Sequence, residues 1–177
     1  LAMRQGRLEL QGMSGSINGG GFEASGALAL SGLRPRSGRV ELKGRGAALD
    51  WPRGFVGEWD ADLALAAEDA AATLSGEVRL ASGSYDGNPR ALYTEFEAWR
   101  ALPSQASALD PLRLDLRVRT LEGLRADTLY GRLELSADLT VGGRFAAPVR
   151  LGRIEATPGA QFFLGGRTYD VESLTLD

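Results

Sequence analysis

The sequence has neither cysteine nor histidine among its 177 residues. The absence of cysteine excludes disulfides and thiolate sites, and the absence of both residues excludes the common zinc sites. It also excludes every nucleophile system in which histidine is the base, such as a Ser-His-Asp triad. We therefore predict that the chain is not an enzyme, with no catalytic residue, no metal and no cofactor.

The chain also lacks an excess of positive charge and a long apolar run. Lys and Arg number 20 against 23 Asp and Glu, a net charge of -3. Without a positive field, nucleic acid is not expected as a partner. No stretch approaches the roughly 18 apolar residues of a membrane helix, and the chain opens without a signal-peptide pattern. We expect residues 1–177 to be a single β-rich fragment of a larger protein.

What the sequence has is strict alternation of apolar and polar residues. In Arg39-Val40-Glu41-Leu42-Lys43 the aliphatic side chains point to one face of a strand and the charges to the other. The same alternation covers residues 7–10, 22–33, 59–65, 74–80, 112–121, 129–141, 148–156 and 168–176. Asn18-Gly19 between two such segments is typical of a tight hairpin turn. The pattern predicts a mostly β protein with a long, antiparallel-type sheet, one face of which is exposed to solvent.

Glycine is abundant, with 24 residues, about twice the average frequency of roughly 7%. Five of the glycines open a short unit of glycine, a charged residue, an aliphatic residue, an opposite charge, then Leu or Ala. The unit occurs at residues 6–10, 38–42, 76–80, 131–135 and 152–156. It predicts a glycine bend followed by two inward apolar side chains and an outward pair of opposite charges.

One segment departs from this period. Leu92, Phe96 and Trp99 follow Asn88-Pro89 at helical spacing, which predicts a short helix near residues 89–102. Such a helix either covers an end or edge of the sheet or serves as a mobile lid over an apolar groove. The first interpretation is favoured.

Three clusters of charge are candidates for chemistry. Glu58, Asp60 and Asp62 share one strand face, but Leu63 stands where a calcium loop needs glycine, so a solvated face is favoured over a metal site. Glu95 and Glu97, two apart on the expected helix, point in different directions and do not form a glycosidase pair. The row Arg113, Arg117 and Arg119 faces either lipid headgroups or water, with water favoured.

The remaining candidate is the inward face itself, which is aliphatic and uncharged. Its predicted members are Leu28, Leu30, Val40, Leu42, Leu63, Leu65, Val78, Leu80, Leu112, Leu114, Leu116, Val118, Leu133, Leu135, Leu139 and Val141. In a closed barrel or sandwich these residues interdigitate as a core. In a sheet curled into an open trough they line a groove for an apolar ligand. The pattern alone leaves both interpretations open.

Several segments in order resemble a known family. Residues 112–118, 131–143 and 148–156, then Phe162-Phe163-Leu164-Gly165 and Tyr169-Asp170-Val171-Glu172, resemble the C-terminal region of TamB-type translocation and assembly module proteins. No single motif carries the likeness, and the order of several does. The family is related to AsmA-like and bridge-like lipid-transfer proteins.

The resemblance implies a fold, a place and a role. The fold is a β-taco, an open apolar trough made by a curled sheet. The place is a periplasmic segment of an inner-membrane-anchored protein of a Gram-negative bacterium, working with a TamA-type outer-membrane barrel. The role is outer-membrane biogenesis, in which the groove binds or conducts phospholipid acyl chains between the two membranes. The alternatives are chaperone-like holding of outer-membrane protein or autotransporter strands during secretion, and a structural spacer.

Overall fold

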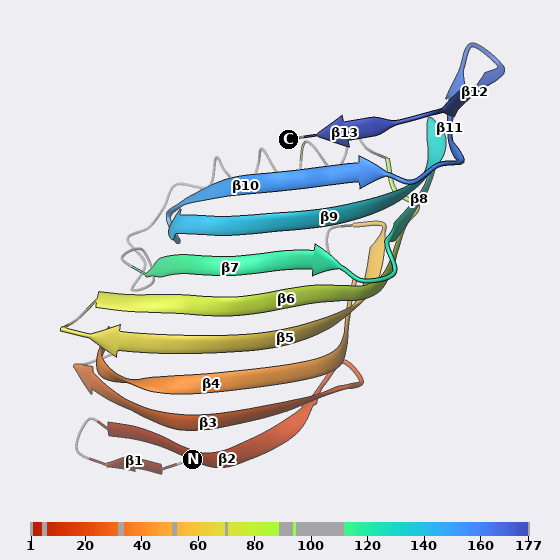
Figure 1. The fold of residues 1–177 in the computed structure, drawn as a ribbon. Coiled ribbons are helices and arrows are strands. Elements are labelled where there is room, and N and C mark those ends of the chain that lie inside the picture. The colour runs from red at the N-terminus through yellow and green to blue at the C-terminus, as the bar shows by residue number, and fades with distance from the viewer. Residues whose placement is uncertain are drawn as a thin grey trace.

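The computed structural model describes residues 2–4, 7–31, 34–50, 53–69, 71–88, 94 and 112–176, and nearly all of them lie in one curled sheet (Figure 1). The strands are β1 (Ala2–Arg4), β2 (Arg7–Ile17), β3 (Gly20–Ser31), β4 (Arg34–Leu49), β5 (Phe55–Glu68), β6 (Ala71–Tyr85), β7 (Arg113–Thr120), β8 (Leu124–Thr128), β9 (Gly131–Arg144), β10 (Ala147–Ala156), β11 (Ala160–Leu164), β12 (Arg167–Val171) and β13 (Leu174–Leu176). The prediction of a mostly β, curled sheet is confirmed. The helix expected near residues 89–102 lies, Thr94 aside, outside the described residues.

The strands follow a simple order with one crossover. β1 to β6 pair consecutively and antiparallel, and β7, β9, β10 and β13 continue the same sheet. The expected antiparallel pairing holds for every described pair except β6–β7 and β6–β8, which are parallel. A parallel pair needs a long connection, and here the chain from Asp86 to Leu112 provides it. Alternation has the same period in both kinds of sheet, so it could not reveal this crossover.

The turn between β2 and β3 is the one that the sequence predicts. Asn18 and Gly19 have φ values of 47° and 85°, and Ile17 pairs with Gly20 across the turn. Two consecutive positive φ angles characterise the type I′ turn, whose twist matches that of the flanking strands. The predicted hairpin is confirmed.

A line of irregularities crosses the sheet, which we call the crease. β7 and β8 both pair with β6 and β9 and are separated only by residues 121–123. β10 and β11 both pair with β9 and are separated by residues 157–159. The register also shifts between Gly44 and Ala47 on β4 and between Glu58 and Trp59 on β5. Because bulges and breaks bend strands, their alignment explains why the sheet curls there (Figure 1).

The hydrophobic core is thin and divided in two. One cluster, on the β7 side, consists of Leu28, Ala67, Ala72 and Leu112. The other, at the crease and on the β8 side, consists of Phe55, Leu80, Tyr85 and Ala126. No described side chain is less than 2% exposed. The chain exposes 12215 Å², whereas a compact protein of 18.8 kDa exposes about 8,300 Å². Both observations fit a single curved layer better than a sandwich.

The repeated glycines hold neighbouring strands close together. Gly38, Gly76 and Gly152, each of which opens a repeated unit, have φ values of 120°, 133° and 138°. A Cβ atom at any of them would lie 2.1–2.2 Å from a carbonyl oxygen of the adjacent strand. L-residues rarely adopt this conformation, and a side chain would also clash with backbone. At these three positions the glycine of the unit is therefore required by its positive φ and by the close approach of the adjacent strand.

Candidate functional site: the apolar inner face

The strand register places apolar side chains in rows across the inner face of the sheet. Directly paired residues point to the same face, so each row can be followed from strand to strand. The central row is Ala24, Leu42, Leu63, Gly76, Leu116 and Val141. The rows beside it are Gly26, Val40, Leu65, Leu74, Leu114 and Gly143, and Phe22, Gly44, Ala61, Val78, Val118 and Leu139. At about 4.8 Å per strand, this charge-free surface is about 24 Å long from β3 to β9.

All sixteen residues predicted to line the groove lie on this face. Ten of them belong to the three rows. Leu28, Leu80 and Leu112 are buried, with exposures of 4%, 3% and 8%. Leu30 packs against the first cluster, and Leu133 against the second. Leu135 pairs with Leu124 and Ala156. Apart from the three buried leucines, the set is half-buried, a state intermediate between core and free surface.

The sequence analysis missed the aromatic part of the inner face. Phe55, Trp59 and Tyr85 belong to or pack against the second cluster, and the Phe55 and Trp59 ring centroids are 6.0 Å apart. The indole Nε1 of Trp59 is buried and has no hydrogen-bond partner in the described part of the chain. The sequence pattern that predicts these aromatic residues on the inner face is the alternation Phe55-x-Gly57-x-Trp59. It is hard to recognise because glycine interrupts the apolar positions. This face is therefore both aliphatic and aromatic.

The charge-free lining ends at β10. Arg150 pairs with Val141 and extends the central row, so its side chain lies on the inner face and is exposed. On the same strand, Val149 and Leu151 point to the opposite, outer face and are 55% and 69% exposed. The inner-face rows are therefore free of charge from β3 to β9, and apolar and charged side chains exchange faces at residues 149–151 of β10.

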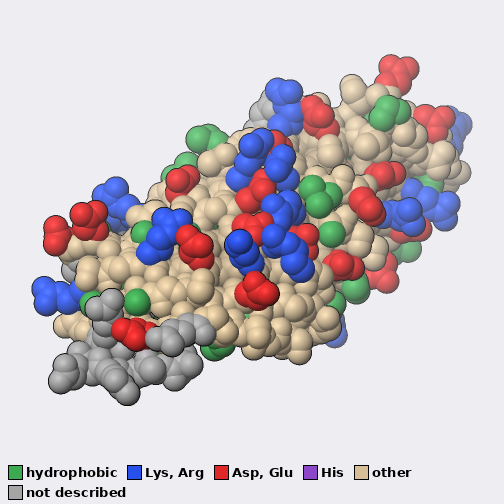
Figure 2. Space-filling model, turned by 60° about the horizontal axis from the view of Figure 1, so that its bottom comes forward, with side chains coloured by type: hydrophobic (Ala, Val, Ile, Leu, Met, Phe, Trp, Pro, Cys, Tyr) green, Lys and Arg blue, Asp and Glu red, His purple; other side chains and the backbone are tan. Residues whose placement is uncertain are grey.

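The outer face carries a chain of ion pairs, which we call the charge ladder. Arg45 donates two hydrogen bonds to the Asp62 carboxylate at 2.7 and 3.0 Å, and Arg79 donates another at 2.5 Å. Arg79 also donates to Glu77 at 2.8 Å, and Glu77 accepts from Arg119. Figure 2 shows acidic and basic side chains gathered next to one another on one face. The charge ladder therefore spans four strands, β4 to β7, including the parallel junction.

The charge ladder explains the acidic and basic rows seen in the sequence. The hydrogen bonds from Arg45 and then Arg79 lower the pKa of Asp62, and the one from Arg119 lowers the pKa of Glu77. The neighbouring Arg117 binds Asp138 at 2.6 and 2.9 Å. Arg117 and Arg119 thus have carboxylate partners within the sheet, in keeping with the interpretation that their row faces water.

Acid is expected to weaken the fold through these carboxylates. A depressed pKa adds stability at pH values above the ordinary value near 3.8, and this stability is lost as the pH falls through the lower folded value. We expect Asp62→Asn to flatten the loss of stability below about pH 5 and to cost about 1 kcal/mol at pH 7. Urea denaturation between pH 2 and 7 measures both, and an unchanged pH slope would contradict the assignment. Asp115→Asn on β7 is the control, because Asp115 is an exposed carboxylate on the same outer face that takes no part in the charge ladder.

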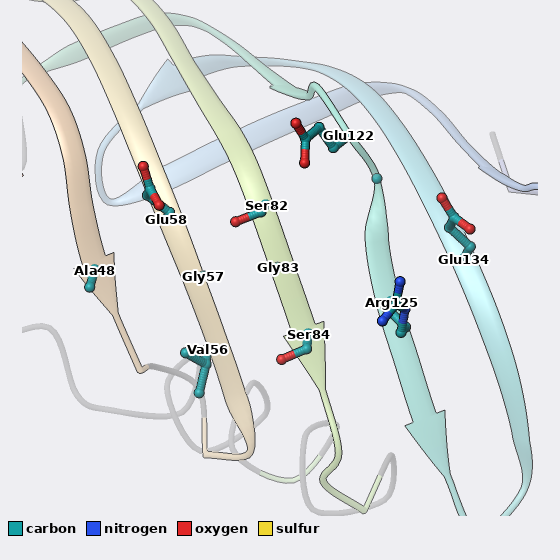
Figure 3. Close-up of a pocket in the computed structure, with 11 residues that line it drawn as sticks. Ala48, Val56, Gly57, Glu58, Ser82, Gly83, Ser84, Glu122, Arg125 and Glu134 are labelled. Carbon is teal, nitrogen blue, oxygen red and sulfur yellow. The ribbon is translucent and has the colours of Figure 1, made fainter.

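A hollow of about 460 Å³ lies on the outer face across β4, β5, β6, β8 and β9. Figure 3 shows Glu58, Ser82 and Ser84 on one side of it and Arg125 and Glu134 on the other. Its lining includes the charged side chains Glu58, Glu122, Arg125 and Glu134, which do not suit an acyl chain. Within the described ranges, no group of three or more acidic side chains is arranged to hold a metal ion.

The comparisons with known proteins agree with the fold. The family model of the TamB C-terminal domain matches residues 11–174, which is the sheet from β2 to β13. No curated protein and no solved structure matches the chain. In the described part of the chain, no helix has the length and apolar character to cross a membrane. The chain belongs to the TamB family, an envelope-associated family of outer-membrane biogenesis and translocation assembly whose members are associated with TamA.

Proposed function

We propose that this chain holds phospholipid acyl chains along its inner face, as one periplasmic section of a trough between the inner and outer membranes. The observation that carries the proposal is the set of charge-free rows from β3 to β9, whose large apolar side chains are only half-buried. A packed core would exclude a ligand, and a charged face would repel an apolar one. The parent protein would be anchored in the inner membrane and meet a TamA-type barrel.

The energetics favour such a ligand. An acyl chain gains about 0.8 kcal/mol for each CH₂ group that leaves water. For a chain of about 16 carbons lying in an open trough, with half of its surface removed from water, the gain is about 6 kcal/mol. A carboxylate introduced on the inner face removes part of this gain, because the charged group stays hydrated and keeps water beside the acyl chain. The bound lipid should therefore respond to single charges on the inner face.

Leu139 and Thr140 provide a matched test. They are neighbours on β9, but Leu139 pairs with Val118 on the inner face, whereas Thr140 pairs with Arg117 on the outer face. We expect Leu139→Asp to reduce copurifying phospholipid at least tenfold and Thr140→Asp to leave it unchanged. Native mass spectrometry with lipid extraction measures the lipid, and circular dichroism measures the fold.

Two results would contradict the proposal. Equal lipid content in the two variants would mean that the inner face does not hold the ligand. An unfolded Leu139→Asp beside a folded Thr140→Asp would mean that the inner face is a closed core. Wild-type protein that folds without any lipid would favour the spacer interpretation.

One observation favours a second candidate, the holding of outer-membrane protein strands. β13 pairs only with residues 154–156 of β10, so residues 147–153 have no strand on that side in the described part of the chain. A free edge flanked by the exposed Val149 and Leu151 is suited to adding a client strand. Charging it with Val149→Lys and Leu151→Lys should abolish capture of an unfolded barrel protein while leaving lipid bound. If the Val149→Lys variant and the Leu151→Lys variant both capture the unfolded barrel protein as the wild type does, the strand-holding function is wrong.

A further inference from the structure

Two adjacent turns expose large apolar side chains at one end of the sheet. The hairpin β11–β12 contributes Phe162, Leu164 and Tyr169, which are 38%, 72% and 49% exposed. The turn between β8 and β9 contributes Leu129 and Tyr130, at 86% and 47%. The Phe163 N–H donates a hydrogen bond to the Tyr130 carbonyl at 2.8 Å, which fixes the two turns side by side. We call these five exposed residues the tip patch.

The tip patch continues the inner face beyond the trough. Phe162 pairs with Gly131 on β9 and with Tyr169 on β12, so all three residues share one face. Gly131 is two residues from Leu133, which packs against the second core cluster on the inner face. The apolar surface therefore runs without a change of face from the trough to the free end of the hairpin.

The opposite face of the hairpin is mostly polar. Gln161 donates a hydrogen bond to the Asp170 carboxylate at 3.1 Å, and Thr168 lies on the same side as this pair. Arg167 pairs with Leu164, so this cation lies at the tip on the apolar face and not on the polar back. An element with an exposed apolar face, a polar back and a cation at its end resembles structures that lie half in water and half in hydrocarbon.

We propose that the tip patch inserts into the surface of a phospholipid bilayer, so that the trough opens directly onto acyl chains. Only the transfer of lipid rests on the proposed function, because the bilayer contact follows from the tip patch alone. Of the two most exposed large apolar residues of the described chain, Leu129 lies in the turn between β8 and β9, and Leu164 is the last residue of β11. Figure 1 shows the β11–β12 hairpin projecting from the end of the sheet. Tyr130 and Tyr169 suit the headgroup level, where aromatic rings with a polar end gather.

A pair of single charges on the two faces of the hairpin tests the proposal. Leu164→Asp adds a charge to the tip patch, and Thr168→Asp adds the same charge to the polar back. We expect the full chain to cosediment with vesicles of phosphatidylethanolamine and phosphatidylglycerol, and Leu164→Asp to weaken this partitioning at least tenfold. Thr168→Asp should change it less than threefold. Leu164 is largely exposed, so its replacement should leave the circular dichroism spectrum unchanged.

The outcomes separate this proposal from the proposed function. Equal partitioning of the two variants, or no binding of wild-type protein to vesicles, overturns it. Loss of a barrel partner by Leu164→Asp, with vesicle binding intact, also overturns it and assigns the tip patch to a protein contact. Leu139→Asp on the inner face should keep vesicle binding whether or not it loses copurifying lipid. Loss of lipid binding by the inner face is therefore distinguishable from loss of vesicle binding by the tip patch.

Discussion

Gly76→Ala is expected to lower the free energy of unfolding by about 3 kcal/mol, because it combines backbone strain with a clash. Gly76 has a φ of 133°, and a Cβ atom there would lie 2.1 Å from the Asp62 carbonyl oxygen and 3.0 Å from the Leu63 Cα. Both atoms belong to the backbone of β5, which is paired with β4 on its other side. The clash can be relieved only by moving paired strands, and the crowded residue Asp62 also anchors the charge ladder.

Gly44→Ala is the matched control for this prediction. Gly44 lies on the same inner face, has no positive φ, and has only the Ala61 Cβ, at 4.0 Å, near a new methyl group. Its replacement should change stability by less than about 0.5 kcal/mol. Chemical denaturation followed by circular dichroism measures both variants. Similar losses in the two would mean that glycine is used here for flexibility alone, not for the close approach of strands.

Gly152→Ala tests whether the stability lost by such a substitution depends on how many strands flank the glycine. Its φ is 138°, and a Cβ atom would lie 2.2 Å from the Asp138 carbonyl oxygen, almost the geometry of Gly76. On β10, however, residues 147–153 pair on one side only in the described part of the chain. The strand can move outward to relieve the clash, so Gly152→Ala should cost less than Gly76→Ala.

The parts of this fold that the sequence predicts are those encoded locally. Alternation identifies the strands because side chains on a strand repeat every two residues, and the turn at Asn18-Gly19 follows from two positive φ angles. The repeated glycine unit likewise marks Gly38, Gly76 and Gly152 as positions that need glycine, because each has a positive φ angle. The inner face also follows from alternation alone, since the strand register brings all the predicted lining residues to one face.

The parts that the sequence does not predict depend on distant segments. The parallel junction of β6 and β7 joins strands separated by the chain from Asp86 to Leu112, and nothing local specifies its direction. The short strands β8 and β11 exist as separate elements only because the crease interrupts longer strands. The tip-patch residues were visible only as members of the alternating segments 129–141 and 168–176 and of the motif Phe162-Phe163-Leu164-Gly165, because their exposure depends on where the hairpin projects. Position in the sheet, not residue type, separates a residue of the inner face from a residue of the tip patch.

Leu80→Ala is expected to cost about 3 kcal/mol, a large share of the stability of a single-layer sheet. Leu80 is 3% exposed and lies at the crease, within the second core cluster. The space that it fills is prepared by two glycines, since a Cβ atom at Gly57 would lie 2.8 Å from its Cδ1 and one at Gly83 3.0 Å from its Cδ2. Truncation should leave a cavity there, because the surrounding strands are fixed by their hydrogen bonds.

Leu116→Ala is the control that connects this stability to the function. Leu116 pairs with Gly76 and Val141 in the central row of the inner face and is only half-buried. In an open trough its truncation should cost about 1 kcal/mol, because much of its side chain already faces solvent or ligand. Denaturation of both variants, with and without bound lipid, measures the difference. Equal losses would show that the rows are packed as tightly as the crease, whereas a small loss for Leu116→Ala with weaker lipid binding shows that the crease holds the fold while the rows hold the ligand.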